Sequence, residues 1–161
     1  RRSCISDGII HKKGGKKLKR GDIYYANFDG GVGSEQIGIR PVVVIQNDAG
    51  NKYSPTTIVS IITSKHKRHL PTHVFVKKDD ANGLAVDSTI ELEQLKTVDK
   101  SRLCGDRIGF LSAEDLNQVE RALKISLGIK SEGEQRIERK GKTIVINSDL
   151  FTSRRNQQSY A

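Results

Sequence analysis

The chain has 161 residues and a formal net charge of +9, with 35% hydrophobic and 29% charged residues. This length suits a single folded domain with a sizeable core. No apolar run approaches the roughly 18 residues that cross a bilayer, and the polar N-terminus lacks the apolar stretch of a secretory signal, so we expect a cytoplasmic protein without a membrane span. The two cysteines, Cys4 and Cys104, lack metal-ligand spacing and are expected to be unpaired thiols.

The positive charge lies at the two ends of the chain. Residues 1–20 hold eight Lys or Arg against one acid, Asp7, and residues 130–161 hold seven against four. Residues 21–129 hold 13 basic and 14 acidic side chains. Basic segments such as HKKGGKKLKR attract phosphate backbones without reading sequence, although such segments are as often only solvated tails. The central body is neutral, so any specific binding there must come from individually placed groups.

Short β-strands account for most of the central body. The stretches rich in branched and aromatic residues are GDIYYANF (21–28), PVVVIQN (41–47), TTIVSIIT (56–63), THVFVK (72–77) and STIELEQL (88–95). The run at 41–47 is continuously apolar at its start, which predicts a strand covered on both faces. Residues 48–55 are predicted to form a loop, and residues 96–111 a short strand and turn.

One amphipathic helix follows the strands. Ser112 is a good N-cap with Asp115 three residues later, and the helix is expected to end at Gly128. Its apolar positions at helical spacing are Leu116, Val119, Leu123 and Leu127. Strands without crossover helices predict antiparallel pairing, so we expect a mostly β, α+β fold: a small antiparallel barrel with a C-terminal helix. Beyond it, residues around 140–141 could form a small hairpin.

Arg40 stands directly before the apolar run at 41–47, behind the polar loop GGVGSEQIG. The loop supplies Ser34, Glu35 and Gln36 together with accessible backbone N–H groups. A rigidly anchored guanidinium beneath such a loop could bind a phosphodiester in a bidentate manner. The residues alone equally allow a structural ion pair of Arg40 with Glu35 or Asp48.

Further polar groups have two interpretations each. Lys65, Lys67 and Arg68 follow the third strand and could form a phosphate-binding rim or a solvated loop. Asn47 could read a base edge, although hydrogen bonding in a turn is the commoner role. His73 is more often a satisfied strand histidine than a general acid. Aromatic residues are scarce, and the candidates for base stacking are Phe28 and Tyr53, either of which could instead be packing.

The blocks KRGDIYYANF, GSEQIGIRPVVVIQND, SPTTIVSIIT, LPTHVFV and IELEQLKTVDKSRL resemble, in this order, the MazF/PemK family of toxin–antitoxin endoribonucleases. The pattern is most similar to MazF of Gram-positive bacteria and covers roughly residues 19–129. The resemblance therefore implies a basic, flexible arm over 1–18, an endoribonuclease domain over 19–129 and a C-terminal extension over 130–161.

The resemblance implies an SH3-like barrel of the MazF/CcdB type that assembles as a homodimer. It also implies the toxin of a type II toxin–antitoxin system: an endoribonuclease that uses neither metal nor other cofactor and cuts single-stranded mRNA at a specific sequence. A cognate antitoxin with an acidic C-terminal segment would silence it. By motif, the family's catalytic pair falls on Arg40 and Thr63, its loop glutamate on Glu35, and a further pair on Glu93 and Gln94.

Cleavage without a metal uses the 2′-hydroxyl of the RNA as nucleophile and leaves a 2′,3′-cyclic phosphate and a 5′-hydroxyl. Arg40 suits stabilisation of the dianionic phosphorane, and the Thr63 hydroxyl suits donation to a non-bridging oxygen. Glu35 is the best base on chemical grounds, with Glu93 as its rival. The remaining candidates, Ser34, Gln36, Asn47, Lys65, Lys67, Arg68 and Gln94, are predicted RNA-binding residues.

Two other functions fit the same fold class. One is a toxin that poisons DNA gyrase, which would not need a phosphate-binding loop. The other is a non-catalytic nucleic-acid-binding barrel, which only the basic flanks support.

Overall fold

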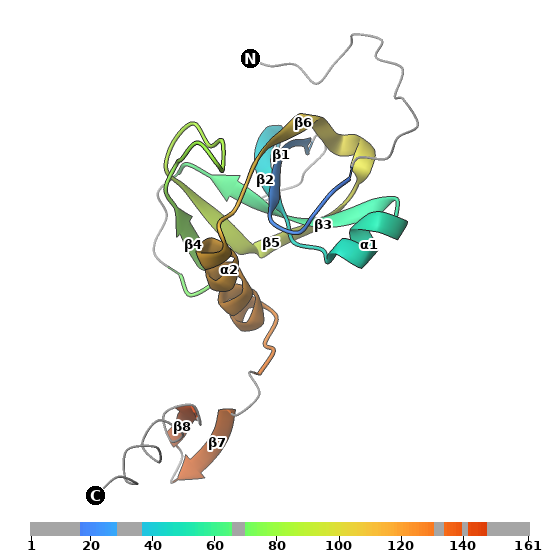
Figure 1. Ribbon diagram of the computed structural model, residues 1–161. Coiled ribbons are helices and arrows are strands. Elements are labelled where there is room, and N and C mark those ends of the chain that lie inside the picture. Colours follow the sequence, from blue (N-terminus) through green and yellow to red (C-terminus); the bar gives the residue numbers. More distant parts are fainter. Residues whose placement is uncertain (1–16, 29–36, 66–69, 131–133, 140–141, 148–161) are drawn as a thin grey trace, which may run out of the picture. The chain divides into compact units, whose positions relative to one another are not determined.

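The computed structural model describes residues 17–28, 37–65 and 70–130, together with the backbone of two further strands at 134–139 and 142–147 (Figure 1). The chain divides into two compact units, Arg1–Ser126 and Leu127–Ala161, which are described separately.

A single six-stranded sheet forms the first unit, in the order β4-β5-β3-β2-β1-β6 (Figure 1). Every neighbouring pair is antiparallel, as the lack of crossover helices predicts. The strands are β1 (Asp22–Asn27), β2 (Ile39–Val44), β3 (Thr56–Thr63), β4 (His73–Val76), β5 (Ser88–Asp99) and β6 (Leu103–Phe110).

The central strand β2 is buried on both faces, as its continuous apolar run predicts. Val43 belongs to a core cluster that also contains Ile23, Ile62 and residues of the helix α2 (Ala113–Ser126). Val42 and Val44 belong to a second cluster on the other face of the sheet. Alternation along each strand therefore distributes the side chains between two cores.

The two edges of the sheet meet beyond the end of β4. The backbone N–H of Phe110, at the end of β6, donates to the carbonyl of Ala81 at 3.0 Å. Glycines allow this approach, because a Cβ at Gly83 would lie 2.0 Å from the carbonyl oxygen of Ile108. A Cβ at Gly109 would lie 2.2 Å from the backbone of Asn82. The segment after β4 thus approaches the end of β6, while the sheet itself stays open, because β4 and β6 do not pair. The expected mostly β, antiparallel fold is confirmed.

Helix α2 begins and ends where the capping signals predict. The backbone N–H of Asp115 donates to Ser112 Oγ at 3.0 Å, and the hydroxyl of Ser112 donates to the Asp115 carboxylate at 2.7 Å. Gly128, with φ of 66°, follows the helix. The helix buries Val119, Ala122 and Leu123. The expectation that Leu127 continues this apolar face is wrong, since α2 ends at Ser126 and Leu127 is 57% exposed.

Three local predictions need correction. Residues 48–53, predicted as loop, form the short helix α1 (Asp48–Tyr53). Strand β5 continues to Asp99, four residues beyond its predicted end, and a 3₁₀ turn, η1 (Lys100–Arg102), links it to β6. Cys104 is disulfide-bonded and not a free thiol, and its partner lies outside the described residues.

In the second unit, β7 (Glu134–Arg139) and β8 (Lys142–Asn147) pair antiparallel, with Arg139 opposite Lys142. The hairpin predicted around residues 140–141 is confirmed.

Candidate active site

Arg40 lies near the start of β2, where Pro41 follows it. Its guanidinium Nε donates to the carbonyl of Ile37 at 3.0 Å, so the side chain folds back over the end of the preceding loop. Arg40 is half-buried. Within residues 17–28, 37–65 and 70–130 it forms no ion pair, and Asp48 instead accepts from the backbone N–H of Arg20 at 2.8 Å. Its remaining donors can therefore serve a ligand.

Thr63 ends β3, the strand beside β2. Val42 pairs with Ile61 in this part of the sheet, and both lie in the same core cluster. Continuing this register by two residues along each strand brings Arg40 opposite Thr63, on the same face. We call this the site face: the face of the sheet that carries Val42, Ile61, Arg40 and Thr63. Thr63 is 3% exposed, and its Oγ1 accepts from the backbone N–H of Lys65 at 3.2 Å.

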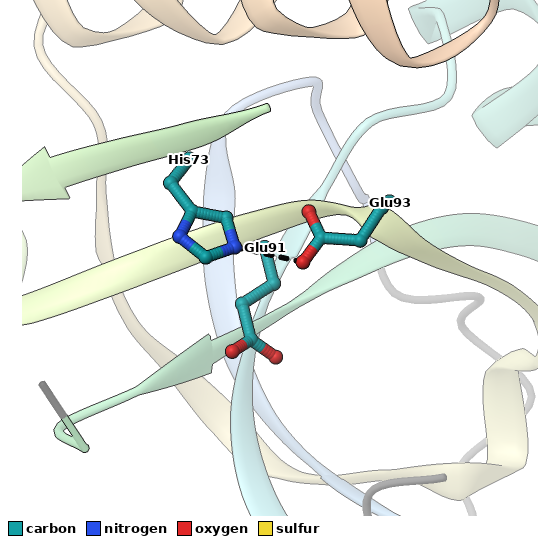
Figure 2. A group of neighbouring side chains, drawn as sticks. All are labelled: His73, Glu91 and Glu93. Atoms are coloured by element: carbon teal, nitrogen blue, oxygen red, sulfur yellow. Dashed lines mark hydrogen bonds and ion pairs between the residues drawn. The ribbon is translucent and has the colours of Figure 1, made fainter. Parts of the chain in front are cut away.

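Three titratable side chains, His73, Glu91 and Glu93, meet on the site face one row further along the strands (Figure 2). Glu91 pairs with Ile61 of β3 on one side and with His73 of β4 on the other. Glu91 is fully buried. His73 Nε2 and Glu93 Oε1 lie 2.7 Å apart, and the His73 side chain is only 4% exposed. His73 thus has a hydrogen-bond partner in Glu93. This is the commoner role of a histidine in a strand.

A bulge in β5 positions Glu93 and Gln94. Ile61 pairs with Glu91 but Ser60 pairs with Leu95, so residues 92–94 are extra on β5. Bulges of this kind turn side chains away from the regular pleat and occur beside active sites. Glu93 is exposed at 36% of its side chain, and Gln94 is half-buried.

The environment of Glu93 favours its ionised form. Partial burial raises the pKa of Glu93, but hydrogen bonds from His73, from the backbone and from Thr72 outweigh this, and the pKa lies below its ordinary value. A carboxylate with a lowered pKa is a weaker proton acceptor at neutral pH. This argues against Glu93 as a general base.

Replacing Glu93 with glutamine tests this point. We expect kcat to fall by less than about tenfold, because a lost general base costs roughly 10²–10⁴. The lowered pKa also means that Glu93 stabilises the fold above its unfolded pKa and loses this effect as the pH falls through the folded value. The difference in melting temperature between wild type and Glu93→Gln should therefore shrink below about pH 4. A hundredfold loss of kcat with unchanged melting would make Glu93 the base.

Oxygen and nitrogen atoms that could bind a metal also occur in this cluster. In the described part of the chain, one atom each of His73, Glu91 and Glu93 can come within 4.8 Å of the others. The His73 nitrogen nearest Glu93 is already engaged in their hydrogen bond.

Other predicted site residues lie elsewhere. Asn47 follows the opposite end of β2 and caps α1, where its side chain accepts from the N–H of Gly50 at 2.7 Å. The structure therefore shows the turn role for Asn47 and does not bring it to Arg40. Lys65 is exposed two residues beyond Thr63. Ser34, Glu35, Gln36, Lys67 and Arg68 lie outside the described residues.

The two candidates for base stacking, Phe28 and Tyr53, differ in exposure. Phe28 is 4% exposed, belongs to the core and is covered by Lys96, whose Nζ lies 5.2 Å from the ring centroid. Tyr53 is 77% exposed on α1, beside Lys52.

Sequence reasoning did not single out Glu91. A signal was present, because the alternation in STIELEQL sets Glu91 and Glu93 on one face and Ile90 and Leu92 on the other.

The fold, an antiparallel six-stranded α+β body with Arg40 and Thr63 on one face, is that of a known class of toxins. A family model described as PemK-like, MazF-like toxin of type II toxin–antitoxin systems matches residues 19–127. This chain belongs to that family.

Solved structures of the same fold cover nearly the whole of their own chains. An endoribonuclease from a mycobacterial species, solved with its cognate antitoxin, has a TM-score of 0.59 and 22% identity over 71% of this chain and 98% of that one. The Mycobacterium tuberculosis toxin MazF-mt6 has a TM-score of 0.57 and 24% identity over 68% and 99%. MazF from Deinococcus radiodurans has a TM-score of 0.59 and 24% identity over 69% and 96%. At these identities the comparisons establish the fold.

Among the described residues, α2 is the longest helix, and no helix there is long and apolar enough to cross a membrane.

Proposed function

We propose that this protein is the toxin of a type II toxin–antitoxin system, acting in the cytoplasm as a sequence-specific endoribonuclease on single-stranded mRNA. The proposal is supported by the membership of the chain in the PemK/MazF-like family. It is also supported by the pairing of Val42 with Ile61, because continuing this register by two residues sets Arg40 opposite Thr63. Arg40 has donors to spare, and Thr63 offers a hydroxyl beside it.

Arg40 and Thr63 have separate roles at the phosphate. The 2′-oxygen attacks phosphorus, the bond to the 5′-oxygen breaks, and the leaving 5′-oxygen takes a proton from water. A 2′,3′-cyclic phosphate and a 5′-hydroxyl result. Arg40 stabilises the negative charge that builds up on the non-bridging oxygens, because its donors are held by β2 and by the carbonyl of Ile37. Thr63, nearly buried, donates one hydrogen bond to the same oxygens.

Glu35 takes the proton from the 2′-hydroxyl in this mechanism. The loop that contains it leads into β2 next to Arg40, and the lowered pKa of Glu93 makes that rival less suitable. Ser34 and Gln36 from the same loop, and Lys65, Lys67 and Arg68 after Thr63, contact the RNA around the cleaved bond. Glu93 and Gln94, on the bulge of β5, contact bases.

Incubation of the purified protein with a long RNA in EDTA tests the function. Cleavage at a recurrent sequence, with 2′,3′-cyclic phosphate ends, is expected, and the Arg40→Ala variant is the control for contaminating ribonucleases. No cleavage by the wild type, with or without added divalent metal, would favour a gyrase poison or a non-catalytic binder.

We propose a homodimer as the active form. The first unit is small, and two exposed apolar side chains, Ile37 and Ile39, lie beside Arg40 on the approach to β2. Sedimentation at micromolar concentration should give twice the chain mass of 17.9 kDa. A mass of one chain at concentrations that still cleave RNA would contradict this.

The cognate antitoxin should be a protein with an acidic segment and a few apolar anchors. Such a segment would place carboxylates where RNA phosphates otherwise bind near Arg40 and would therefore compete with RNA.

The basic arm should raise RNA affinity without choosing the cleaved bases. Residues 1–16 hold five Lys or Arg against Asp7, and Leu18, which is 4% exposed in the second core cluster, should be kept in any deletion. The comparison is made in a Cys104→Ser background, because Cys4 also lies within residues 1–16. Removing residues 1–16 should make the dependence of log Kd on log salt shallower, by about 0.7 for each RNA phosphate that the arm neutralises. The cleavage sequence should stay the same, and a changed sequence in end mapping would make the arm a reading element.

A further inference from the structure

Exposed aromatic rings are rare on this molecule. The chain has four Phe and four Tyr and no Trp. Among the described residues, the aromatic side chains with substantial exposure are Tyr53 at 77%, Phe110 at 47% and Phe75 at 40%. Tyr53 lies on α1 beside Lys52, and the Phe110 ring, at the end of β6, lies 5.6 Å from the guanidinium of Arg107. Phe75 lies on neither of these elements but on strand β4.

Phe75 lies in the same cross-strand row as the proposed catalytic pair. It pairs with Thr89 of β5, and Thr89 pairs with Thr63 of β3. Its neighbours along β4, Val74 and Val76, are buried in the helix-side core cluster. Alternation therefore turns Phe75 to the site face, together with Thr63 and Arg40.

The distances suit a nucleotide next to the cleaved bond. Neighbouring strands are about 4.8 Å apart, so Phe75 stands roughly 10 Å from Thr63 and roughly 14 Å from Arg40. An extended single strand that binds its phosphate at Arg40 and crosses the strands toward β4 reaches this ring within a few nucleotides. Single-stranded RNA splays its bases, and flat exposed rings are what such bases stack on.

We propose that Phe75 is a stacking platform for an RNA base flanking the cleaved phosphodiester, an inference that rests on the proposed endoribonuclease function. Phe75, on edge strand β4, belongs to neither core cluster, and a base would cover the exposed part of its ring. Every base has an aromatic face, so Phe75 holds the RNA in place without selecting its sequence. Selection belongs to polar groups such as Glu93 and Gln94 on the neighbouring bulge.

Binding to a single-stranded oligonucleotide of the mapped cleavage sequence, made uncleavable by a 2′-deoxy substitution at the cut, tests the platform. Stacking on an aromatic side chain changes affinity by roughly 5- to 150-fold for each base. Phe75→Ala should raise Kd within this range, leave the single-turnover rate at saturating RNA nearly unchanged, and leave the salt slope and the cleavage sequence as in the wild type. Phe110→Ala removes a ring of comparable exposure from β6, 47% against 40%, and should bind like the wild type.

A second variant reports stacking directly. Phe75→Trp introduces the single tryptophan of the chain, and its fluorescence should be quenched by the oligonucleotide while affinity stays near the wild-type value. Wild-type affinity of Phe75→Ala, or equal losses in Phe75→Ala and Phe110→Ala, overturns the platform. Conversion of Phe75→Ala to a species of one chain mass, or loss of antitoxin binding with normal RNA binding, assigns the ring to a protein interface instead. If the wild type itself neither binds nor cleaves RNA, the proposed function fails and the platform with it.

Discussion

Replacing Arg40 with alanine should abolish RNA cleavage, and replacing it with lysine should lower kcat by at least about a hundredfold. Removal of a single preorganised donor to a charged transition state typically costs roughly 10²–10³ in rate. Lysine keeps the charge, but an ammonium cannot donate in parallel to two phosphate oxygens and cannot make the bond from Nε to the carbonyl of Ile37. The measurement is single-turnover cleavage of an RNA that contains the mapped site.

The control for Arg40 is the melting temperature, which should change little because the side chain is half-buried and, among the described residues, donates to one carbonyl, that of Ile37. Thr63→Ala should lose less activity than Arg40→Ala, because it removes one hydrogen bond. Near-wild-type cleavage by Arg40→Lys would remove Arg40 from the role of stabilising the phosphorane. Equal losses in Arg40→Ala and Thr63→Ala would give the hydroxyl a larger part than a single hydrogen bond.

Features that depend on residues close together in the sequence could be predicted from it. The apolar run at 41–47 predicts a strand buried on both faces, and β2 contributes to both core clusters. Ser112 and Gly128 predict the limits of α2, because capping uses groups within one turn of the helix. The same reasoning missed α1, since DAGNKY is rich in turn formers and its helix is held by distant contacts. One such contact is the hydrogen bond of 2.5 Å that Lys100 Nζ donates to the carbonyl of Asn51.

The site depends on strand register, which composition does not encode. Arg40 and Thr63 are 23 residues apart in the sequence, and only the pairing of Val42 with Ile61 places them opposite each other. Their joint assignment came from the resemblance to a family and not from periodicity. His73 and Glu93 likewise meet because β4 pairs with β5. Phe28 was a stacking candidate by residue type alone, and its burial follows from the second core cluster, to which β1, β2, β3, β5 and β6 all contribute.

The contact between the segment after β4 and the end of β6 determines how firmly β4 and β5, which carry Phe75 and Glu93, are held. Gly83 is one of the two glycines that permit this contact. Gly83 has φ of 65°, and a Cβ there would lie 2.0 Å from the carbonyl oxygen of Ile108. Gly83→Ala would add the cost of a left-handed alanine, about 1–2 kcal/mol, to that of pushing a backbone segment aside, about 1–3 kcal/mol. A combined loss of about 3 kcal/mol should lower the melting temperature by roughly 10 °C or more.

Gly128→Ala is the matched control for Gly83→Ala. Gly128 has φ of 66°, but a Cβ there would meet nothing within 4 Å, so its substitution isolates the backbone cost alone. The melting temperature should fall by only several degrees. Because the segment that Gly83 anchors follows directly from β4, Gly83→Ala should also weaken RNA binding at temperatures where the protein is still folded, and Gly128→Ala should not. Equal melting temperatures for the two variants would mean that the edges of the sheet are not locked together at Gly83.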